Sequence, residues 1–135
     1  MLLHLLCLVL SAQSMPRGIV GQEAPSLRGV RWVQTVDDIT PSVDEGKVNY
    51  IFFFQSWCPG CHSHGLPTLK VLHEKFSNKV NFIAVQTVFE GFNTNTKERA
   101  IADVKSFGLD IPVGHDGPPG TPSPLMRVYR AGGTP

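Results

Sequence analysis

A central mixed β-sheet flanked by helices, an α/β fold, is the architecture that the sequence predicts. Two apolar runs, residues 49–55 and 80–88, are continuous, which is typical of strands covered on both faces. After each run, apolar residues recur at three- and four-residue steps, as on the buried side of a helix. The order strand, helix, strand, helix, strand therefore predicts right-handed crossovers and a sheet with helices on its faces.

Composition supports a single globular domain and excludes several other classes. The chain has 135 residues, of which 41% are apolar, so disorder, collagen and coiled coil are not expected. Twelve Lys and Arg against eleven Asp and Glu leave a net charge of +1 without a basic patch, so nucleic acid is not an expected partner. The longest apolar run is shorter than the ~20 residues of a membrane-spanning helix, so we expect no stable membrane insertion.

The first residues resemble a leader. Residues 1–14 form an apolar run that ends in the small-x-small pattern Ala12-Gln13-Ser14, which makes them a candidate signal peptide. Met15 offers a second start, and no Lys or Arg precedes the apolar run. We expect an extracytoplasmic protein, periplasmic or secreted, if residues 1–14 are a signal, and a cytoplasmic one if it begins at Met15. Residues 15–29 should form an extended segment before a domain at residues 30–135.

The first half of the domain should contain two strands and a helix. Residues 30–35 alternate like a short strand, and residues 37–47 form a polar connection. Residues 49–55 (NYIFFFQ) are the strongest strand prediction. The helix that follows should end near Asn78. Its apolar face is formed by Leu66, Leu69, Leu72 and Phe76.

The second half should contain a strand, a helix and a further short strand. After the strand at residues 80–88, Asn95 and Glu98 resemble a capping pair that opens a helix, and Gly108 should close it. The rest of the chain is expected to form a short strand, a loop and a helical turn at residues 111–113, 117–124 and 125–129.

Cys58 and Cys61 form a C-x-x-C pair where the strand at residues 49–55 gives way to the helix. At a helix N-terminus, unpaired N–H groups and the helix dipole favour a thiolate, so the pKa of Cys58 should lie below its free value of ~8.5. Pro59 suits a first helical turn because it has no N–H to leave unpaired. Cys61, one turn further on, can attack a mixed disulfide formed at Cys58. The pattern thus predicts exchange between a dithiol and a disulfide.

Three other interpretations of the pair stay open. An inert disulfide would close a loop too small to stabilise the fold much. Zinc would need four ligands, drawn from the thiols and from His62, His64 or His73. The run CPGCH also matches the attachment pattern of c-type haem, with Met126 as a distal ligand. The aromatic strand before the pair favours the redox dithiol, so we expect no metal and no cofactor.

With these motifs the sequence resembles the thioredoxin-like superfamily, and within it the redoxin branch that includes TlpA-like thiol-disulfide oxidoreductases and AhpC/TSA proteins. The resemblance is carried by GQEAPSL (21–27), YIFFFQSWCPGC (50–61), Pro67 and YRAGGTP (129–135). It implies a three-layer fold, with Cys58 as the attacking thiol and Cys61 as the resolving thiol. The partner would be a protein with a disulfide or dithiol, or a small thiol.

The resemblance also implies which residues contact the substrate. These residues are Trp57, Pro59, Gly60, Thr134 and Pro135. Pro135 would follow a cis peptide bond opposite the disulfide, so that the backbone of Thr134 faces the thiols. Residues 120–122, which also read Gly-Thr-Pro, are a rival for this position.

Several positions depart from the family pattern. Phe52 stands where many relatives have a buried carboxylate or Asn, so proton handling would fall to water or to His62, which could support the thiolate or carry a proton. Pro67 comes one residue later than usual, and Gly65 should absorb the extra residue as a bulge or kink. Gln55 occupies the place of the Thr that a peroxiredoxin site requires. Peroxidase activity is therefore the runner-up, and a binding module without turnover is a third interpretation.

The family pattern continues beyond the position of Pro135 with a β-hairpin and a closing helix. We therefore expect the 135-residue chain to be a fragment, C-terminally incomplete, with one edge of its sheet unpaired. Such a chain should be less stable and less active than one extended by those elements.

Overall fold

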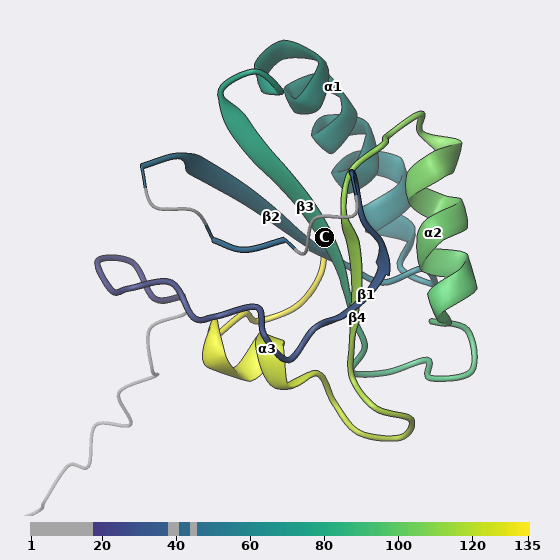
Figure 1. The fold of residues 1–135 in the computed structure, drawn as a ribbon. Coiled ribbons are helices and arrows are strands. Elements are labelled where there is room, and N and C mark those ends of the chain that lie inside the picture. Colours follow the sequence, from purple (N-terminus) through teal and green to yellow (C-terminus); the bar gives the residue numbers. More distant parts are fainter. Residues whose placement is uncertain (1–17, 38–40, 44–45) are drawn as a thin grey trace, which may run out of the picture.

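Four strands form one mixed sheet in the computed structural model, which describes residues 18–37, 41–43 and 46–135 (Figure 1). The candidate signal peptide lies outside these residues. The strands lie in the order β1-β4-β3-β2, with β2, β3 and β4 parallel and β1 antiparallel to β4. Their bounds are Arg31–Gln34 for β1, Val48–Phe54 for β2, Val80–Thr87 for β3 and Val113–Asp116 for β4. The predicted α/β fold with a central mixed sheet is confirmed.

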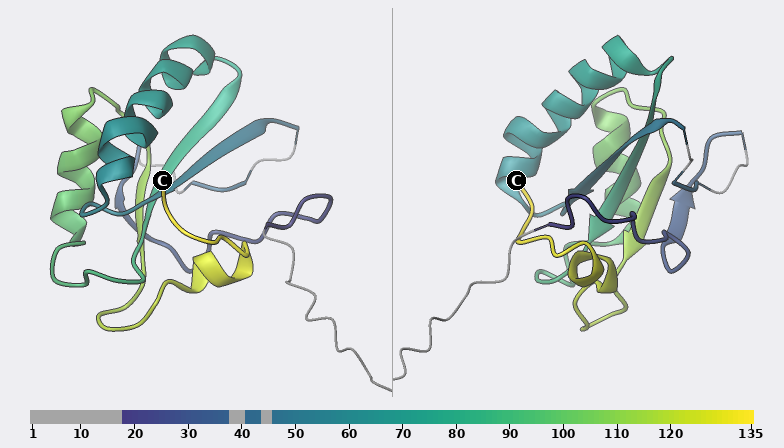
Figure 2. Two further views of the ribbon diagram at one scale, coloured as in Figure 1. Left: turned by 180° about the vertical axis from the view of Figure 1, so that it is seen from behind. Right: turned by 90° about the vertical axis from the view of Figure 1, so that its left-hand side faces the viewer.

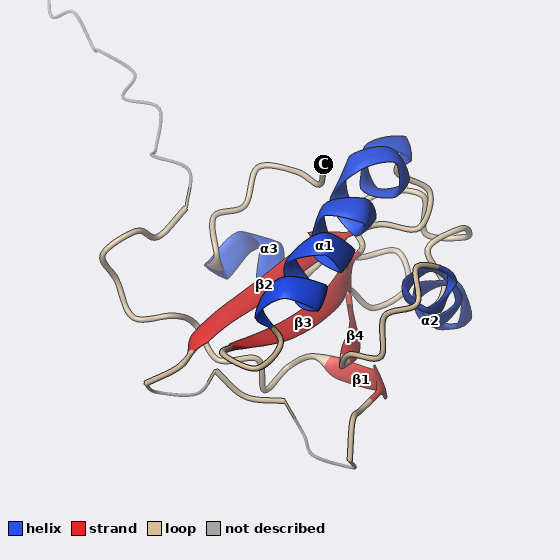
Figure 3. Cartoon of the chain, turned by 90° about the horizontal axis from the view of Figure 1, so that it is seen from above, coloured by secondary structure: helices blue, strands red, loops and turns tan. Residues whose placement is uncertain are grey.

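Helices lie around this sheet, as Figure 3 shows. After β2 a short π-helical turn, η1 (Cys61–Gly65), continues directly into α1 (Leu66–Phe76). Helix α2 (Lys97–Ser106) connects β3 to β4, and a single helical turn, α3 (Pro124–Val128), follows β4. None of the described helices is both long and apolar enough to cross a membrane.

Two apolar clusters cover opposite faces of the sheet. Strand β3 contributes to both, because successive side chains of a strand point to opposite faces. Helices α1 and α2 lie on one face of the sheet and α3 on the other (Figures 1 and 2). Phe82 and Ala84 belong to the cluster that includes residues of α1 and α2, whereas Ile83 and Val85 belong to the cluster that includes Leu125 of α3. Both faces of β3 are therefore buried, as the continuous apolar run at residues 80–88 predicts. The helix side is completed by Phe52, Phe54, Leu66, Leu69, Ala100 and Val104, and the other side by Leu27, Val30 and Leu125.

The bounds expected for the last strand are wrong. The sequence predicts residues 111–113, but β4 spans Val113–Asp116 and pairs with both β1 and β3. Backbone pairing on two sides defines this strand, and its side chains carry no apolar alternation. Gly114 fits here because a Cβ at this position would overlap the side chain of Val30 and press on the Trp32 ring.

The start of α2 also differs from the expected capping pair of Asn95 and Glu98. Thr96 is the N-cap: its backbone is extended, and its hydroxyl accepts a hydrogen bond from the Arg99 N–H at 3.3 Å. The other end is as predicted, since Gly108 follows the helix with a φ of +69° that favours glycine. Asn95 is buried instead and serves the loop that carries the cysteines.

Candidate active site

The two thiols follow the carboxyl end of β2, where the chain turns into a helix (Figure 1). The Cys58 N–H donates to the Gln55 carbonyl at 3.0 Å, and helical conformation begins at Pro59. The Cys61 N–H then donates to the Cys58 carbonyl at 3.1 Å. Cys58 therefore immediately precedes the first turn, and Cys61 lies one turn further along. Both cysteines are free thiols.

The environment of Cys58 favours its thiolate. Burial by itself would raise the pKa of this thiol, which is 8% exposed. Hydrogen bonds from the Cys61 thiol, the Thr134 side chain and the backbone N–H groups of Cys61 and Gly60 outweigh that effect and lower the pKa. Cys58 is therefore the thiol that ionises first.

Cys61 has the opposite environment. It is fully buried, and this burial is the main reason that its pKa rises to about 12. The backbone N–H of Gln55 opposes the rise, whereas the neighbouring Cys58 adds to it by hydrogen bonding and by charge. At neutral pH Cys61 is a thiol beside a more acidic partner.

The C-terminal residues lie over the thiols, although 77 positions separate Pro135 from Cys58. In both views of Figure 2 the C-terminus lies beside the start of the helix that follows β2. The Pro135 carbonyl accepts a hydrogen bond from Cys58 Sγ at 2.5 Å and lies 3.7 Å from Cys61 Sγ. It also lies against Gly60, where a Cβ would overlap it. Thr134 hydrogen-bonds to both thiols. The structure thus places residues 134–135 beside the C-x-x-C pair, and the rival residues 120–122 in the loop between β4 and α3.

The cis peptide bond expected before Pro135 is absent. No cis bond occurs among the described residues, so Thr134 and Pro135 are joined in trans. Trans is the intrinsic preference of X-Pro bonds by about 0.5–1 kcal/mol, and only surrounding contacts reverse it. The contacts made here by the Pro135 carbonyl and the Thr134 side chain are compatible with the trans form.

Trp57 and Pro59 form an exposed surface on either side of Cys58. The Trp57 side chain is 43% exposed, although its backbone N–H is held by Asn95 Oδ1 at 3.1 Å. Gly91 packs against the same ring, since a Cβ there would lie 3.1 Å from Trp57 Cδ1. An exposed indole that is fixed at its base can contact a partner without first becoming ordered.

Buried amides beneath this loop escaped the sequence analysis. Gln55 Oε1 accepts from the Asn95 side-chain amide at 3.2 Å, and Gln86 Oε1 accepts from the Ser56 N–H at 3.1 Å. Gln55, Gln86 and Asn95 are at most 2% exposed. They connect the cysteine loop to the end of β3 and to the start of α2. One feature of the sequence could have indicated these residues: Gln55 and Gln86 lie at or near the ends of apolar runs, where buried amides need hydrogen-bond partners.

The bulge expected at Gly65 is confirmed. The π-helical turn η1 ends at Gly65 and accommodates the extra residue between Cys61 and Pro67. Phe52 lies directly opposite, so a Cβ on Gly65 would come within 2.5 Å of the Phe52 ring. An aromatic ring therefore occupies the space between β2 and the bulge.

The His62 imidazole turns toward the preceding loop and toward α2. Its Nε2 lies 2.8 Å from the Ser56 carbonyl and 3.8 Å from a carboxylate oxygen of Asp103. The other histidines of this segment are engaged elsewhere: His64 hydrogen-bonds to Ser63, and His73 packs edge-on against Phe82. Across the described ranges, no three His, Cys, Asp or Glu side chains gather in a way that could hold a metal ion.

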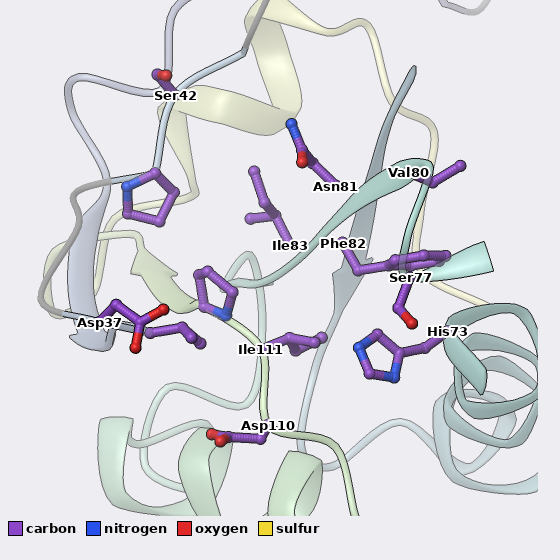
Figure 4. Close-up of a pocket in the computed structure, with 13 residues that line it drawn as sticks. Asp37, Ser42, His73, Ser77, Val80, Asn81, Phe82, Ile83, Asp110 and Ile111 are labelled. Carbon is purple, nitrogen blue, oxygen red and sulfur yellow. The ribbon is translucent and has the colours of Figure 1, made fainter. Parts of the chain in front are cut away.

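A separate cavity of about 340 Å³ lies at the opposite end of the sheet (Figure 4). It is lined at the amino end of β3 by Phe82 and Ile83, with the carboxylates of Asp37 and Asp110 on its wall and His73 across from them. The cysteines follow the carboxyl end of β2, so this cavity is not part of the thiol site.

Fold and site together define a class: α/β proteins with a C-x-x-C pair at the start of a helix that follows a parallel strand. No family model matches the chain, and no significant relative occurs among curated proteins. Solved structures do match. A thiol-disulfide isomerase from Corynebacterium glutamicum is 34% identical over 83% of this chain and 75% of that chain, with a TM-score of 0.67. A thioredoxin-like superfamily protein is 30% identical over 83% of this chain and 74% of that chain, with a TM-score of 0.69. The chain belongs to the thioredoxin-like superfamily.

Proposed function

We propose that the chain is a thiol-disulfide oxidoreductase that exchanges its Cys58-Cys61 dithiol or disulfide with protein or small-thiol partners. The observation that carries this proposal is the asymmetry of two neighbouring thiols. The pKa of the outer thiol, Cys58, is lowered, and that of the buried thiol, Cys61, is raised to about 12. The similarity to a thiol-disulfide isomerase supports the same class of chemistry.

The proposed reaction has two exchange steps. In the first, the Cys58 thiolate attacks one sulfur of a partner disulfide, a mixed disulfide forms, and the other partner sulfur leaves as a thiolate. In the second, the Cys61 sulfur bonds to Cys58 Sγ, the bond between Cys58 and the partner breaks, the partner sulfur leaves as a thiolate, and the Cys61 proton is released. The partner disulfide is reduced by two electrons and the Cys58-Cys61 pair is oxidised. The reverse sequence oxidises a partner dithiol.

A partner would reach Cys58 across the surface that surrounds it. Trp57 and Pro59 are exposed beside the thiol, and Thr134 and Pro135 border it from the other side. The Pro135 carbonyl contacts Cys58 directly, so a partner sulfur must share or displace this contact. An extended segment with a disulfide or thiol fits such a site better than a bulky folded surface.

Catalysed reduction of a disulfide-bonded protein by dithiothreitol tests the proposal. The chain should accelerate reduction well above the uncatalysed rate, and a double variant, Cys58→Ser with Cys61→Ser, should not. Equal rates for the two proteins would contradict the proposal. Consumption of hydrogen peroxide without any disulfide reduction would also contradict it and favour the peroxidase alternative.

A further inference from the structure

We propose that Asp103 is a positioning residue for the redox reaction: its carboxylate faces the His62 ring and stabilises the protonated imidazole when His62 accepts the proton that Cys61 releases as it frees the partner. The inference rests on the proposed function. Neither the sequence patterns nor the similarity to solved structures singles out Asp103. The proposal is based on two contacts of the His62 imidazole, one with Ser56 in the cysteine loop and one with Asp103 on α2.

The second exchange step needs a proton acceptor. Cys61 is fully buried and protonated at neutral pH, with a pKa raised to about 12. A thiol in that state is a poor nucleophile until its proton leaves. His62 is the next residue along the chain, and its side chain is 35% exposed, so a proton that it accepts can pass to solvent.

The contacts of His62 define which ring nitrogen is the base. Nε2 lies 2.8 Å from the Ser56 carbonyl. A carbonyl oxygen can only accept, so Nε2 carries a proton and Nδ1 has the free lone pair. When Nδ1 takes a proton, the positive charge is shared by Nε2, which faces the Ser56 carbonyl and Asp103 together.

Asp103 lies where that positive charge would develop. It extends from α2 toward the cysteine segment, and its Oδ2 is 3.8 Å from His62 Nε2. Oδ2 is buried without a hydrogen-bond partner, and the whole side chain is 14% exposed. A buried carboxylate oxygen without a partner is costly. Protonated His62 would place a positive charge 3.8 Å from this oxygen, so the ion pair formed by the proton transfer offsets part of this cost.

Resolution of the mixed disulfide transfers one proton and releases the partner. Cys61 Sγ forms a bond to Cys58 Sγ, and the disulfide bond between Cys58 and the partner breaks. The partner leaves as a thiolate, and the Cys61 proton passes to His62 Nδ1, directly or through a water molecule. Solvent then takes the proton from His62. Asp103 touches none of the reacting sulfur atoms and acts only through the imidazole.

Rapid mixing of the reduced chain with an aromatic disulfide that releases a coloured thiolate separates the two steps. The first coloured thiolate reports attack by Cys58, and the second reports resolution by Cys61. Asp103→Asn, which keeps the side-chain shape, should slow the second phase about tenfold and leave the first unchanged. His62→Ala should slow the second phase by roughly a hundred-fold, as expected for a lost general base. Added imidazole should restore part of that rate.

Two comparisons distinguish positioning from a structural role. In the His62→Ala background, Asp103→Asn should have no further effect, because its effect passes through the imidazole. Asp103→Glu should retain most of the second-phase rate, and Asp110→Asn is the matched control at a site remote from the thiols. The proposal would be overturned if a folded Asp103→Asn variant kept the wild-type rate of the second phase or slowed both phases equally. It would also be overturned if the rate losses of Asp103→Asn and His62→Ala were additive in the double variant. If wild type gives no second phase, the proposed function fails instead.

Discussion

Replacing Cys61 with serine should leave the protein joined covalently to its partner, because the thiol that frees the partner is gone. Incubation of Cys61→Ser with a disulfide-bonded peptide should give a stable adduct through Cys58, visible by mass spectrometry. Turnover should fall by roughly a thousand-fold or more, as is usual when one member of a catalytic pair is removed. Because the pKa of Cys58 is lowered, adduct formation should stay fast at pH values below ~8.5, the pKa of an ordinary thiol.

Cys58→Ser is the matched control for this experiment. It retains Cys61, which is buried and has a pKa raised to about 12, so little thiolate exists at neutral pH and little adduct should form. Rapid capture through Cys61, or capture by Cys58 only above the ordinary thiol range, would mean that the roles of the two sulfur atoms are assigned wrongly.

Replacing Gly65 with alanine should destabilise the fold despite the better helix propensity of alanine. Gly65 has ordinary helical angles, so propensity alone would stabilise the variant by about 1 kcal/mol. Its Cβ, however, would lie 2.5 Å from Cζ of the buried Phe52, whose ring stacks on Phe54. Overpacking of this kind costs typically about 1–3 kcal/mol, so we expect a net loss of stability in urea unfolding.

Gly29→Ala is the control for Gly65→Ala, because nothing lies within 4 Å of a Cβ at Gly29. Its unfolding free energy should change by less than about 0.5 kcal/mol. Adding Phe52→Leu to Gly65→Ala should recover part of the loss by making room for the methyl group. A more stable Gly65→Ala variant would show that the bulge does not pack tightly on Phe52.

Local patterns predicted most of the elements and the position of the thiols. Continuous apolar runs located β2 and β3. Strand β3 is buried on both faces, whereas β2 lies at the edge of the sheet and fully buries only Phe52 and Phe54. Compared with the family pattern that the sequence resembles, one extra residue lies between Cys61 and Pro67, and this difference predicted the bulge at Gly65. These features depend on neighbours along the chain.

Features that depend on distant partners were not predicted. Asn95 resembled a helix cap by spacing, but it bonds to the side chain of Gln55, 40 positions away. Asp103 lies on a helix with an apolar face, and nothing in that periodicity indicates that it faces His62. The strand β4 lacks apolar alternation because it is defined by pairing on both sides. Hydrogen bonds between remote segments leave no periodic signal.

Equilibration of the chain against a series of glutathione buffers tests most directly whether Cys58 and Cys61 form a reversible redox pair. The fraction oxidised should follow a two-electron transition with a midpoint between roughly −270 and −120 mV, the span of known exchange proteins. A midpoint near the lower value indicates a reductant, and one near the upper value an oxidant. Thiols that stay reduced, or a disulfide that stays oxidised, across the whole series would contradict the central claim.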